Sequence, residues 1–413
     1  MARVPHSSSA AADDWSALVA DRARRVDSST IRDLLAVVGA DHILSLAGGL
    51  PPDGMLPVPE VEAAVRSTLA AGPAALQYGA TEGAPALRGW IAANELDGAD
   101  PARVVVTHGS QQALRLLVEA LVEPGDVVVV ERTSYVGMLQ ALSTTGAVLV
   151  DVEGDAEGMC TDRFEALLSA GCRPKLVYLA PTFQNPTGTV LPVERRRNLG
   201  ALAARYGFVV IDDDPYRELG FEPAPARLRD VVPDALAVTL GSFSKTIAPG
   251  LRVGWVHGPA WLVDVLIRLK QASDLHTGTL GQQIVWSLVS RADWLDEHLA
   301  GLRVLYRHRA QVAIDAFERH FGDAANLATP RGGMFLWVGF PQLGADTDEL
   351  LKVGLQEGVA VVPGSAFDPH GRASQYARVC AVTLENCELD IAVARLARAA
   401  ERLGRNHVAG VSA

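Results

Sequence analysis

The chain has 413 residues, of which 49% are hydrophobic, and this size and composition predict a globular protein of about two domains. A formal net charge of −11 disfavours attraction to a phosphate backbone, so we expect no nucleic-acid partner. No uncharged apolar run approaches the roughly 18 residues of a membrane span, so we expect no membrane association. Residues 1–15 lack the apolar core of a signal peptide, and we expect a disordered lead-in there.

From residue 103 onward, short apolar runs alternate with segments of helical periodicity. Helices are predicted between these runs, at 111–122 and 194–206 among others. Strands are predicted at 103–107, 126–131, 148–152, 175–180, 208–212, 236–240 and 253–257. Continuously apolar, β-branched strands that alternate with helices are typical of an α/β fold with a mostly parallel sheet covered on both faces. Ligands of such sheets bind at the carboxyl ends of the strands.

After residue 258 the pattern changes to long helices and then to short strands separated by Gly and Pro. Helices are predicted at 261–272, 280–291, 294–321 and 389–403, and strands at 332–338, 359–367 and 378–383. We expect a small α+β domain at 321–413 that packs with an N-terminal arm at 16–60, and a large domain at 61–320 between them.

The four cysteines form no Cys-x-x-Cys pair and no Cys/His cluster at the spacing of metal ligands. They are Cys160, Cys172, Cys380 and Cys387. We therefore expect reduced thiols, no bound metal and a cytoplasmic location, and a chance disulfide is the less favoured alternative.

Lys245 is one of only four lysines, and it alone lies in a run of small and hydroxyl residues, 241–252. Arg252 follows seven positions later. A lysine amine in this setting suits a Schiff base to an aldehyde cofactor whose phosphate is held nearby. The alternative is a surface lysine that follows a strand.

Residues 107–112 join a predicted strand to a predicted helix, with Gly109 at the turn. The backbone N–H groups of Ser110 and Gln111 would open the helix, where unpaired donors and the helix dipole favour an anion. This segment therefore predicts a phosphate cradle, and an ordinary helix cap is the alternative.

Two further polar segments follow predicted strands. The turn 184–188 places the amide of Asn185 at the end of one strand, and Asp212, Asp213 and Asp214 follow the next, with Tyr216 close behind. Three neighbouring carboxylates repel one another unless a metal or another cation shares the site. A protonated ring nitrogen facing Asp213 is such a cation, and Tyr216 could bond to a phenolic oxygen of the same ring.

Taken together, these motifs resemble the fold type I pyridoxal-phosphate (PLP) enzymes, specifically the class I/II aminotransferases. The most similar branch contains the 2-aminoadipate and aromatic aminotransferases and supplies the C-terminal domain of GntR-type regulators. The resemblance covers about residues 29–403, including the segments 45–51, 76–83 and 330–337.

The resemblance implies a role in cofactor binding for each motif. Lys245 would attach PLP and later move the substrate proton, Asp213 would pair with the ring nitrogen, and Tyr135 would stack on the ring. The remaining roles concern the 3-oxygen, held by Asn185 and Tyr216, and the phosphate, held by Ser110, Gln111, Ser242, Ser244 and Arg252. Tyr78 would reach the phosphate in the neighbouring subunit, which implies a homodimer with shared active sites.

The same resemblance implies how substrate binds. Arg378 would clamp the α-carboxylate by a two-pronged hydrogen-bonded pair, beside Asn185, and Gly49 would lie in the covering loop. Arg32, on a predicted helix at 28–35, could meet an acidic side chain, although a surface position is an equal alternative. Leu50, Met55 and Leu56 would favour an apolar or aromatic side chain.

Two departures from the family pattern affect the site. Thr133 and Ser134 replace the usual Pro-Thr before Tyr135, which predicts a less rigid turn. The sequence after Arg378 is Val-Cys-Ala-Val-Thr instead of the Leu-Asn-Phe-Ser type, which affects the shape of the substrate pocket.

We therefore expect a PLP-dependent transaminase with ping-pong kinetics. It would move the amino group of an L-amino acid (aromatic, 2-aminoadipate-like or branched and apolar) to a 2-oxo acid such as 2-oxoglutarate or pyruvate. One alternative is another PLP reaction on the same scaffold, by a lyase, decarboxylase or cyclase. A non-enzymatic ligand sensor is least expected, because only about 30 residues precede the resemblance, too few for a DNA-binding domain.

Overall fold

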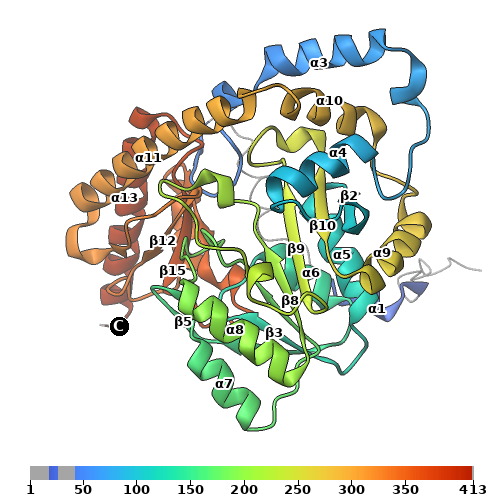
Figure 1. Ribbon diagram of the computed structural model, residues 1–413. Helices are drawn as coiled ribbons and strands as arrows, with labels where there is room; N and C mark the ends of the chain where they lie inside the picture. The colour runs from blue at the N-terminus through green and yellow to red at the C-terminus, as the bar shows by residue number, and fades with distance from the viewer. Residues whose placement is uncertain (1–17, 27–41, 412–413) are drawn as a thin grey trace, which may run out of the picture.

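The structure, a computed structural model, describes residues 18–26 and 42–411, with side chains up to residue 404. The predicted lead-in and the predicted helix at 28–35 lie outside these residues. Figure 1 shows the two main sheets, with the C-terminal strands in orange and red beside the larger sheet. No helix within the described ranges has the length and apolarity that a membrane crossing needs.

The larger sheet has seven strands in the order β2-β10-β9-β8-β7-β3-β4. Its strands are β2 (Val104–Thr107), β3 (Val127–Glu131), β4 (Val148–Val152), β7 (Leu176–Leu179), β8 (Val209–Asp213), β9 (Ala237–Ser242) and β10 (Gly254–His257). β10 runs opposite to the other six strands, which share one direction, so the predicted mostly parallel sheet is confirmed. Each strand ends within two residues of its predicted bounds.

Helices cover both faces of this sheet, which explains why its strands are apolar at consecutive positions. The side chains of Val128 and Val130 pack with one set of helices, and that of Val129 between them packs with another. The first set is α5 (Gly109–Leu121), α6 (Val136–Ser143) and α9 (Ala260–Ser273), and the second is α7 (Thr161–Ser169) and α8 (Val193–Tyr206). A further core under β2 and β10 contains α4 (Pro85–Trp90) and α10 (Thr279–Val289), and α3 (Val58–Ala70) packs on α10.

The smaller sheet has the order β11-β12-β15-β14 and packs against long helices near the C-terminus. Its strands are β11 (Asn326–Leu327), β12 (Phe335–Gly339), β14 (Val362–Pro363) and β15 (Tyr376–Cys380), and its helices are α11 (Trp294–Phe321), α12 (Thr347–Gln356) and α13 (Asn386–Val411). The N-terminal strand β1 (Leu44–Ser45) pairs in parallel with β13 (Val359–Ala360), so both ends of the chain contribute to this part. The remaining short elements are α1 (Asp21–Arg24), β5 (Gly154–Asp155) and β6 (Gly158–Met159).

One strand prediction was wrong. The run 359–367 is not a single strand but β13, β14 and a 3₁₀ turn, Gly364–Phe367. Pro363 has no N–H to continue a ladder, and a Cβ at Gly364 would lie 2.1 Å from the carbonyl oxygen of Ala373. The backbone therefore leaves the sheet at this point. The domain boundaries 16–60, 61–320 and 321–413 and the cytoplasmic location stay predictions.

Candidate active site

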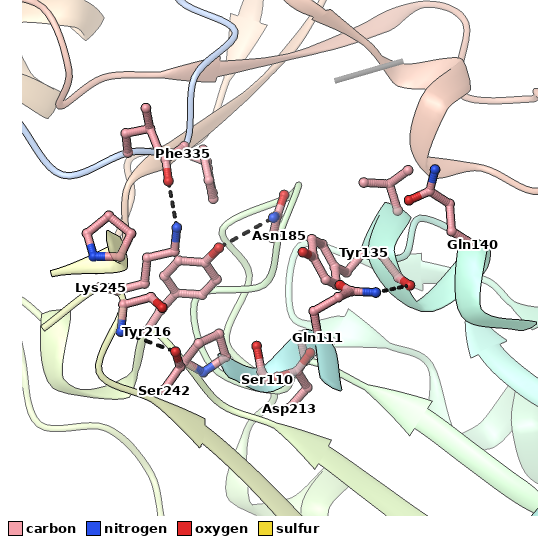
Figure 2. Close-up of a pocket in the computed structure, with 18 of the residues that line it drawn as sticks. Ser110, Gln111, Tyr135, Gln140, Asn185, Asp213, Tyr216, Ser242, Lys245 and Phe335 are labelled. Atoms are coloured by element: carbon pink, nitrogen blue, oxygen red, sulfur yellow. Dashed lines mark hydrogen bonds between the residues drawn. The ribbon is translucent and has the colours of Figure 1, made fainter. Parts of the chain in front are cut away.

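A cavity of about 450 Å³ opens at the edge of the large sheet and also contacts the small one. Twelve of the fourteen predicted site residues line it: Gly49, Ser110, Gln111, Tyr135, Asn185, Asp213, Tyr216, Ser242, Ser244, Lys245, Arg252 and Arg378. Figure 2 shows eight of them around the cavity, on separate parts of the chain: Ser110, Gln111, Tyr135, Asn185, Asp213, Tyr216, Ser242 and Lys245. The other two are Tyr78, which lies outside the cavity lining, and Arg32, which lies outside the described residues.

The topology of the sheet explains this convergence. Asp213 is the last residue of β8 and Ser242 is the last of β9, and these two strands are parallel neighbours. Because β10 runs antiparallel to β9, its beginning lies at the same edge, which brings Arg252 beside them. Residues that are far apart in sequence thus meet at one end of the sheet.

Lys245 points into the cavity, where its Nζ donates a 2.6 Å hydrogen bond to the carbonyl oxygen of Gly49. Burial lowers the pKa of Lys245 to about 8, and the nearby positive charges of Arg378 and Arg252 act in the same direction. About a tenth of this amine is therefore neutral, and so nucleophilic, at pH 7.

Asp213 is buried, and its Oδ2 accepts a 2.8 Å hydrogen bond from the hydroxyl of Tyr178. Its Oδ1 has no partner among the described residues. Burial raises the pKa of Asp213 to about 7, against the opposing effect of the Tyr178 hydrogen bond. A buried carboxylate that lines a cavity and has one unpartnered oxygen suits a cationic N–H donor.

The two carboxylates beside Asp213 serve other partners. Asp214 lies 3.3 Å from Nη1 of Arg227 and 3.5 Å from Nη1 of Arg217, and neither Asp214 nor Asp212 lines the cavity. Side chains along a strand point alternately to opposite faces, so the three carboxylates do not converge on one point. Asp213 alone therefore serves the site.

One end of the cavity has the features of an anion site. α5 begins at Gly109, whose φ of +71° is in the left-handed region, and a Cβ there would lie 2.6 Å from Nη2 of Arg252. That Nη2 donates a 3.0 Å hydrogen bond to the carbonyl oxygen of His108. The backbone N–H of Ser244 donates to Oγ of Ser242, 3.1 Å away. A helix N-terminus, two hydroxyl side chains and a guanidinium thus meet, as a phosphate requires.

Asn185 connects the ring-binding and substrate-binding sides of the cavity. Its Nδ2 lies 3.4 Å from the hydroxyl of Tyr216, and its Oδ1 accepts a 3.0 Å hydrogen bond from Nη1 of Arg378. Burial raises the pKa of Tyr216, so this hydroxyl stays protonated at physiological pH.

Arg378 is buried, and protein groups hold its guanidinium in place. Its Nη2 donates to the carbonyl oxygens of Ala47 and Gly48, at 2.8 and 2.9 Å, and its Cζ lies 4.3 Å from the ring centroid of Phe335. Its Nε has no partner among the described residues. Burial lowers the pKa of Arg378, although an arginine keeps its charge at neutral pH.

Tyr135 precedes α6 and lines the cavity. In the turn before it, Ser134 donates from Oγ to the carbonyl of Glu131 and from N–H to that of Phe367, each at 2.8 Å. These two hydrogen bonds hold the turn that we expected to be less rigid because it lacks a proline.

Two important lining residues were missed at the level of sequence. Tyr178 lies within a run that we interpreted only as a strand, although a tyrosine in a fully buried strand needs a partner for its hydroxyl. Phe335 lies in a segment that we interpreted only as a strand and as part of the family resemblance, and the guanidinium of Arg378 lies over its ring. Leu50, which was expected to favour an apolar side chain, lines the cavity, whereas Met55 and Leu56 do not; the lining residues that were not predicted include Val136, Gly137, Gln140 and Pro215.

Comparison with known proteins identifies the family. Residues 41–396 match the family Aminotransferase class I and II. A 2-aminoadipate transaminase of Thermus thermophilus is 37% identical over 94% of this chain and 98% of its own length. Aromatic-amino-acid aminotransferase 1 of Thermococcus litoralis is 35% identical over 86% of this chain and 88% of its own.

A solved structure supports the same assignment. The α-aminoadipate aminotransferase of Thermus thermophilus, complexed with N-(5′-phosphopyridoxyl)-L-leucine, superposes with a TM-score of 0.88 at 36% identity, covering 94% of this chain and 99% of the other. The chain therefore belongs to the class I and II aminotransferases. It is a PLP-dependent transaminase of amino acids, and the predicted fold class, activity and cofactor are confirmed.

The described residues fit PLP. The unpartnered Oδ1 of Asp213 can accept from the ring nitrogen, and the Gly109 cradle has no Cβ to obstruct a phosphate. The cavity lining also contains one lysine, Lys245.

Proposed function

We propose that this enzyme takes the amino group from an aromatic or apolar L-amino acid and passes it to a 2-oxo acid such as 2-oxoglutarate or pyruvate, with ping-pong kinetics. The observation that carries this proposal is the buried Arg378, which lies between Asn185 and the face of Phe335. One cavity thus offers a fixed cation for a carboxylate and an aromatic wall for an apolar side chain.

The proposed roles follow from where each group lies. When bound, PLP supplies an aldehyde that condenses with amines and a ring that withdraws electrons. Lys245 holds the cofactor and, once freed, accepts the α-proton at its neutral Nζ. Asp213 accepts from the ring N–H, Asn185 and Tyr216 bond to the 3-oxygen, and Tyr135 lies against the ring.

Charged and polar groups at the two ends of the cavity set the orientation of the cofactor and the substrate. The phosphate is held by Ser110, Gln111, Ser242, Ser244 and Arg252. Arg378 and Asn185 hold the substrate, with the α-carboxylate on the guanidinium, and the loop of Gly49 covers it. Since both anionic groups are fixed, the reacting carbon lies between them, near Lys245.

A 2-aminoadipate-like donor is the second candidate, because the relative from Thermus thermophilus carries that name. Its distal carboxylate needs another cation. Among the described residues that line the cavity, the only basic side chains besides Lys245 are Arg252 and Arg378, which the cofactor and the α-carboxylate occupy. Arg32 would have to supply the cation, so this candidate depends on a residue outside the described ranges.

The test is the absorbance spectrum of the purified protein with single L-amino acids and no oxo acid. We expect a band near ~420 nm that Lys245→Ala abolishes and the exposed control Lys352→Ala keeps. Phenylalanine or leucine should convert it to a band near ~330 nm at lower concentration than 2-aminoadipate does. Preference for 2-aminoadipate that Arg32→Ala removes would favour the second candidate. A shifted band without the ~330 nm form would point to elimination, decarboxylation or cyclisation.

We further propose a homodimer in which Tyr78 completes the neighbouring active site. The side chain is 78% exposed and lies outside the cavity of its own chain, next to the 69% exposed Leu76. Mixing Tyr78→Ala with Lys245→Ala tests this directly. In hybrid dimers one site carries both defects and the other carries neither, so activity should return on mixing. No recovery, with dimers verified by ultracentrifugation, would reject the shared site.

A further inference from the structure

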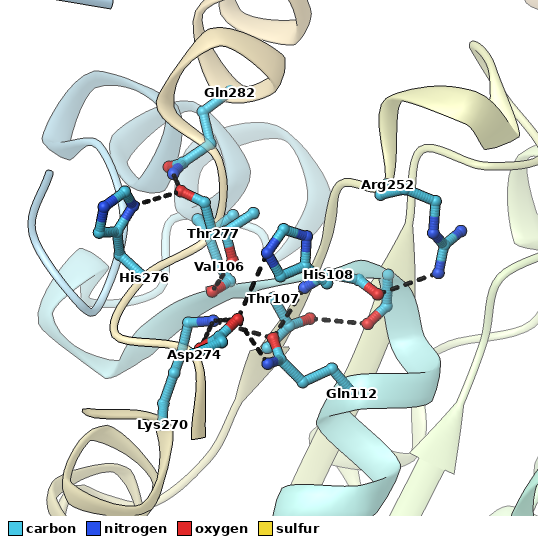
Figure 3. Close-up of polar contacts among 11 residues, drawn as sticks. Val106, Thr107, His108, Gln112, Arg252, Lys270, Asp274, His276, Thr277 and Gln282 are labelled. Atoms are coloured by element: carbon cyan, nitrogen blue, oxygen red, sulfur yellow. Dashed lines mark hydrogen bonds and ion pairs between the residues drawn. The ribbon is translucent and has the colours of Figure 1, made fainter. Parts of the chain in front are cut away.

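A second polar cluster lies behind the phosphate end of the site, and the proposed function gives it no role. At its centre is Lys270 of α9, whose side chain is fully buried. Its Nζ lies 3.0 Å from both carboxylate oxygens of Asp274 and 2.8 Å from Oε1 of Gln112. Figure 3 shows these groups between α9 and α5. A buried ammonium with acceptors for all its protons is held in one position.

The cluster fixes His108, which immediately precedes α5. On the side chain of His108, Nε2 lies 3.3 Å from Oδ2 of Asp274. The backbone N–H of His108 donates a 2.9 Å hydrogen bond to Oε1 of Gln112. Nε2 of Gln112 in turn donates to Oδ2 of Asp274, 2.7 Å away. The imidazole of His108 therefore contacts Asp274, and its N–H is held by Gln112, which itself bonds to Asp274 and Lys270.

The carbonyl of His108 faces the other way, toward the cofactor site. It accepts the 3.0 Å hydrogen bond from Nη2 of Arg252, and the next residues are Gly109 and Ser110 of the cradle. Any displacement of His108 would thus move a guanidinium and the first turn of α5 together. An anion site built from backbone N–H groups depends on their being held in position before the ligand arrives.

We propose that Lys270 and Asp274 are positioning residues for the cofactor phosphate, acting through Gln112 and His108 on Arg252 and the N-terminus of α5. This inference rests on the proposed phosphate cradle. The cluster does not touch the cofactor. It sets where the phosphate-binding groups lie, so its effect must appear only when the ligand carries a phosphate.

The test compares PLP with pyridoxal, which has the same aldehyde and ring but no phosphate. Apoenzyme is titrated with each, and the dissociation constant of pyridoxal is divided by that of PLP for wild type and for Lys270→Met. We expect PLP affinity to fall about tenfold, as for one lost charge-assisted hydrogen bond, and pyridoxal affinity to change less than about twofold. Asp274→Asn is a second variant that retains the volume of the site, should Lys270→Met not fold.

Two further variants make the outcomes distinct. Lys352→Met removes an exposed lysine on α12 and should leave the ratio unchanged. Arg252→Met should lower the ratio strongly if the cradle is correctly assigned. If Arg252→Met changes the ratio and neither cluster variant does, the cluster only joins α9 to α5 and the inference is wrong. If none of them changes it, the cradle assignment itself fails, and the inference with it.

Discussion

The hydroxyl of Tyr178 on β7 donates a 2.8 Å hydrogen bond to Oδ2 of Asp213 on the adjacent strand β8. Oδ1 of the same carboxylate has no partner among the described residues. One oxygen is therefore fixed by the protein, and the other is unpartnered in a carboxylate that lines the cavity. The tyrosine orients the group that we assign to the cofactor's ring nitrogen.

Tyr178→Phe should weaken PLP binding about tenfold near pH 6 and much less near pH 9. The Tyr178 hydrogen bond lowers the pKa of Asp213, so its loss raises that pKa further above about 7. Below this pKa the Asp213 carboxyl is protonated and cannot pair with a ring cation. At high pH this carboxyl is ionised in both wild type and variant. Titration of apoenzyme with PLP at several pH values measures this.

Tyr306→Phe is the matched control. The hydroxyl of Tyr306 is buried without a partner among the described residues, in a core that does not include Tyr178 but does include Tyr216 and Phe335. Its removal should leave PLP affinity unchanged and stability equal or slightly higher. Equal effects of the two variants on PLP affinity would contradict the assigned role of Tyr178.

Reconstitution of apoenzyme should accelerate with pH through a midpoint near 8. Only neutral Lys245 attacks the aldehyde, and its pKa is lowered to about 8 by burial, from 10.5 in an exposed lysine. The neutral fraction rises from roughly a tenth at pH 7 to nearly all at pH 9, so the rate should rise about tenfold. Growth of the absorbance band after PLP addition reports the rate. A midpoint close to 10.5 would contradict a desolvated amine.

Arg378→Lys should raise KM for the amino donor about 100-fold and leave the cofactor spectrum intact. A lysine cannot reproduce the planar pair of N–H donors, and the loss of one strong ionic pair costs about 3 kcal/mol. The control is chemical: an amine with the same side chain but no carboxylate should react equally poorly with both proteins. If the variant discriminates between acid and amine as well as wild type does, the clamp is elsewhere.

Gly109→Ala should weaken PLP binding, whereas Gly98→Ala should not. Both glycines have positive φ, +71° and +80°, so each substitution carries a similar backbone cost of about 1–2 kcal/mol. Only at Gly109 does the new Cβ meet a side chain, Nη2 of Arg252 at 2.6 Å, while nothing lies within 4 Å at Gly98. Thermal unfolding should show comparable losses, and PLP titration should separate the pair. Equal PLP affinities would show that the cradle tolerates a displaced Arg252.

Much of the fold and of the site could be predicted, because the relevant signals are local. Hydrophobic patterning located the strands of the large sheet, and polar motifs at strand ends were expected to converge. The structure brings twelve of the predicted residues to one cavity, although their individual roles stay proposals. Lys245 stood out from its small neighbours without any knowledge of spatial contacts.

The missing contacts join residues whose proximity only the strand order reveals. Tyr178 meets Asp213 because β7 pairs with β8 in the register Tyr178↔Ile211, which periodicity alone cannot specify. Lys270 appeared as one position in a predicted helix, and its partner Gln112 lies on another helix far along the chain. Patterning shows that a position is buried, but not which polar partner makes that burial tolerable.

The bond between Nζ of Lys245 and the carbonyl of Gly49 has a further consequence. The amine that attaches the cofactor also anchors the N-terminal segment, which reaches the small sheet through β1. Loading the cofactor must break this anchor, and the hydrogen bonds from Arg378 to Ala47 and Gly48, together with the pairing of β1 with β13, then hold the covering loop. The empty and loaded enzymes should therefore differ in proteolytic cleavage in the loop around Gly49, which follows β1, even before any substrate binds.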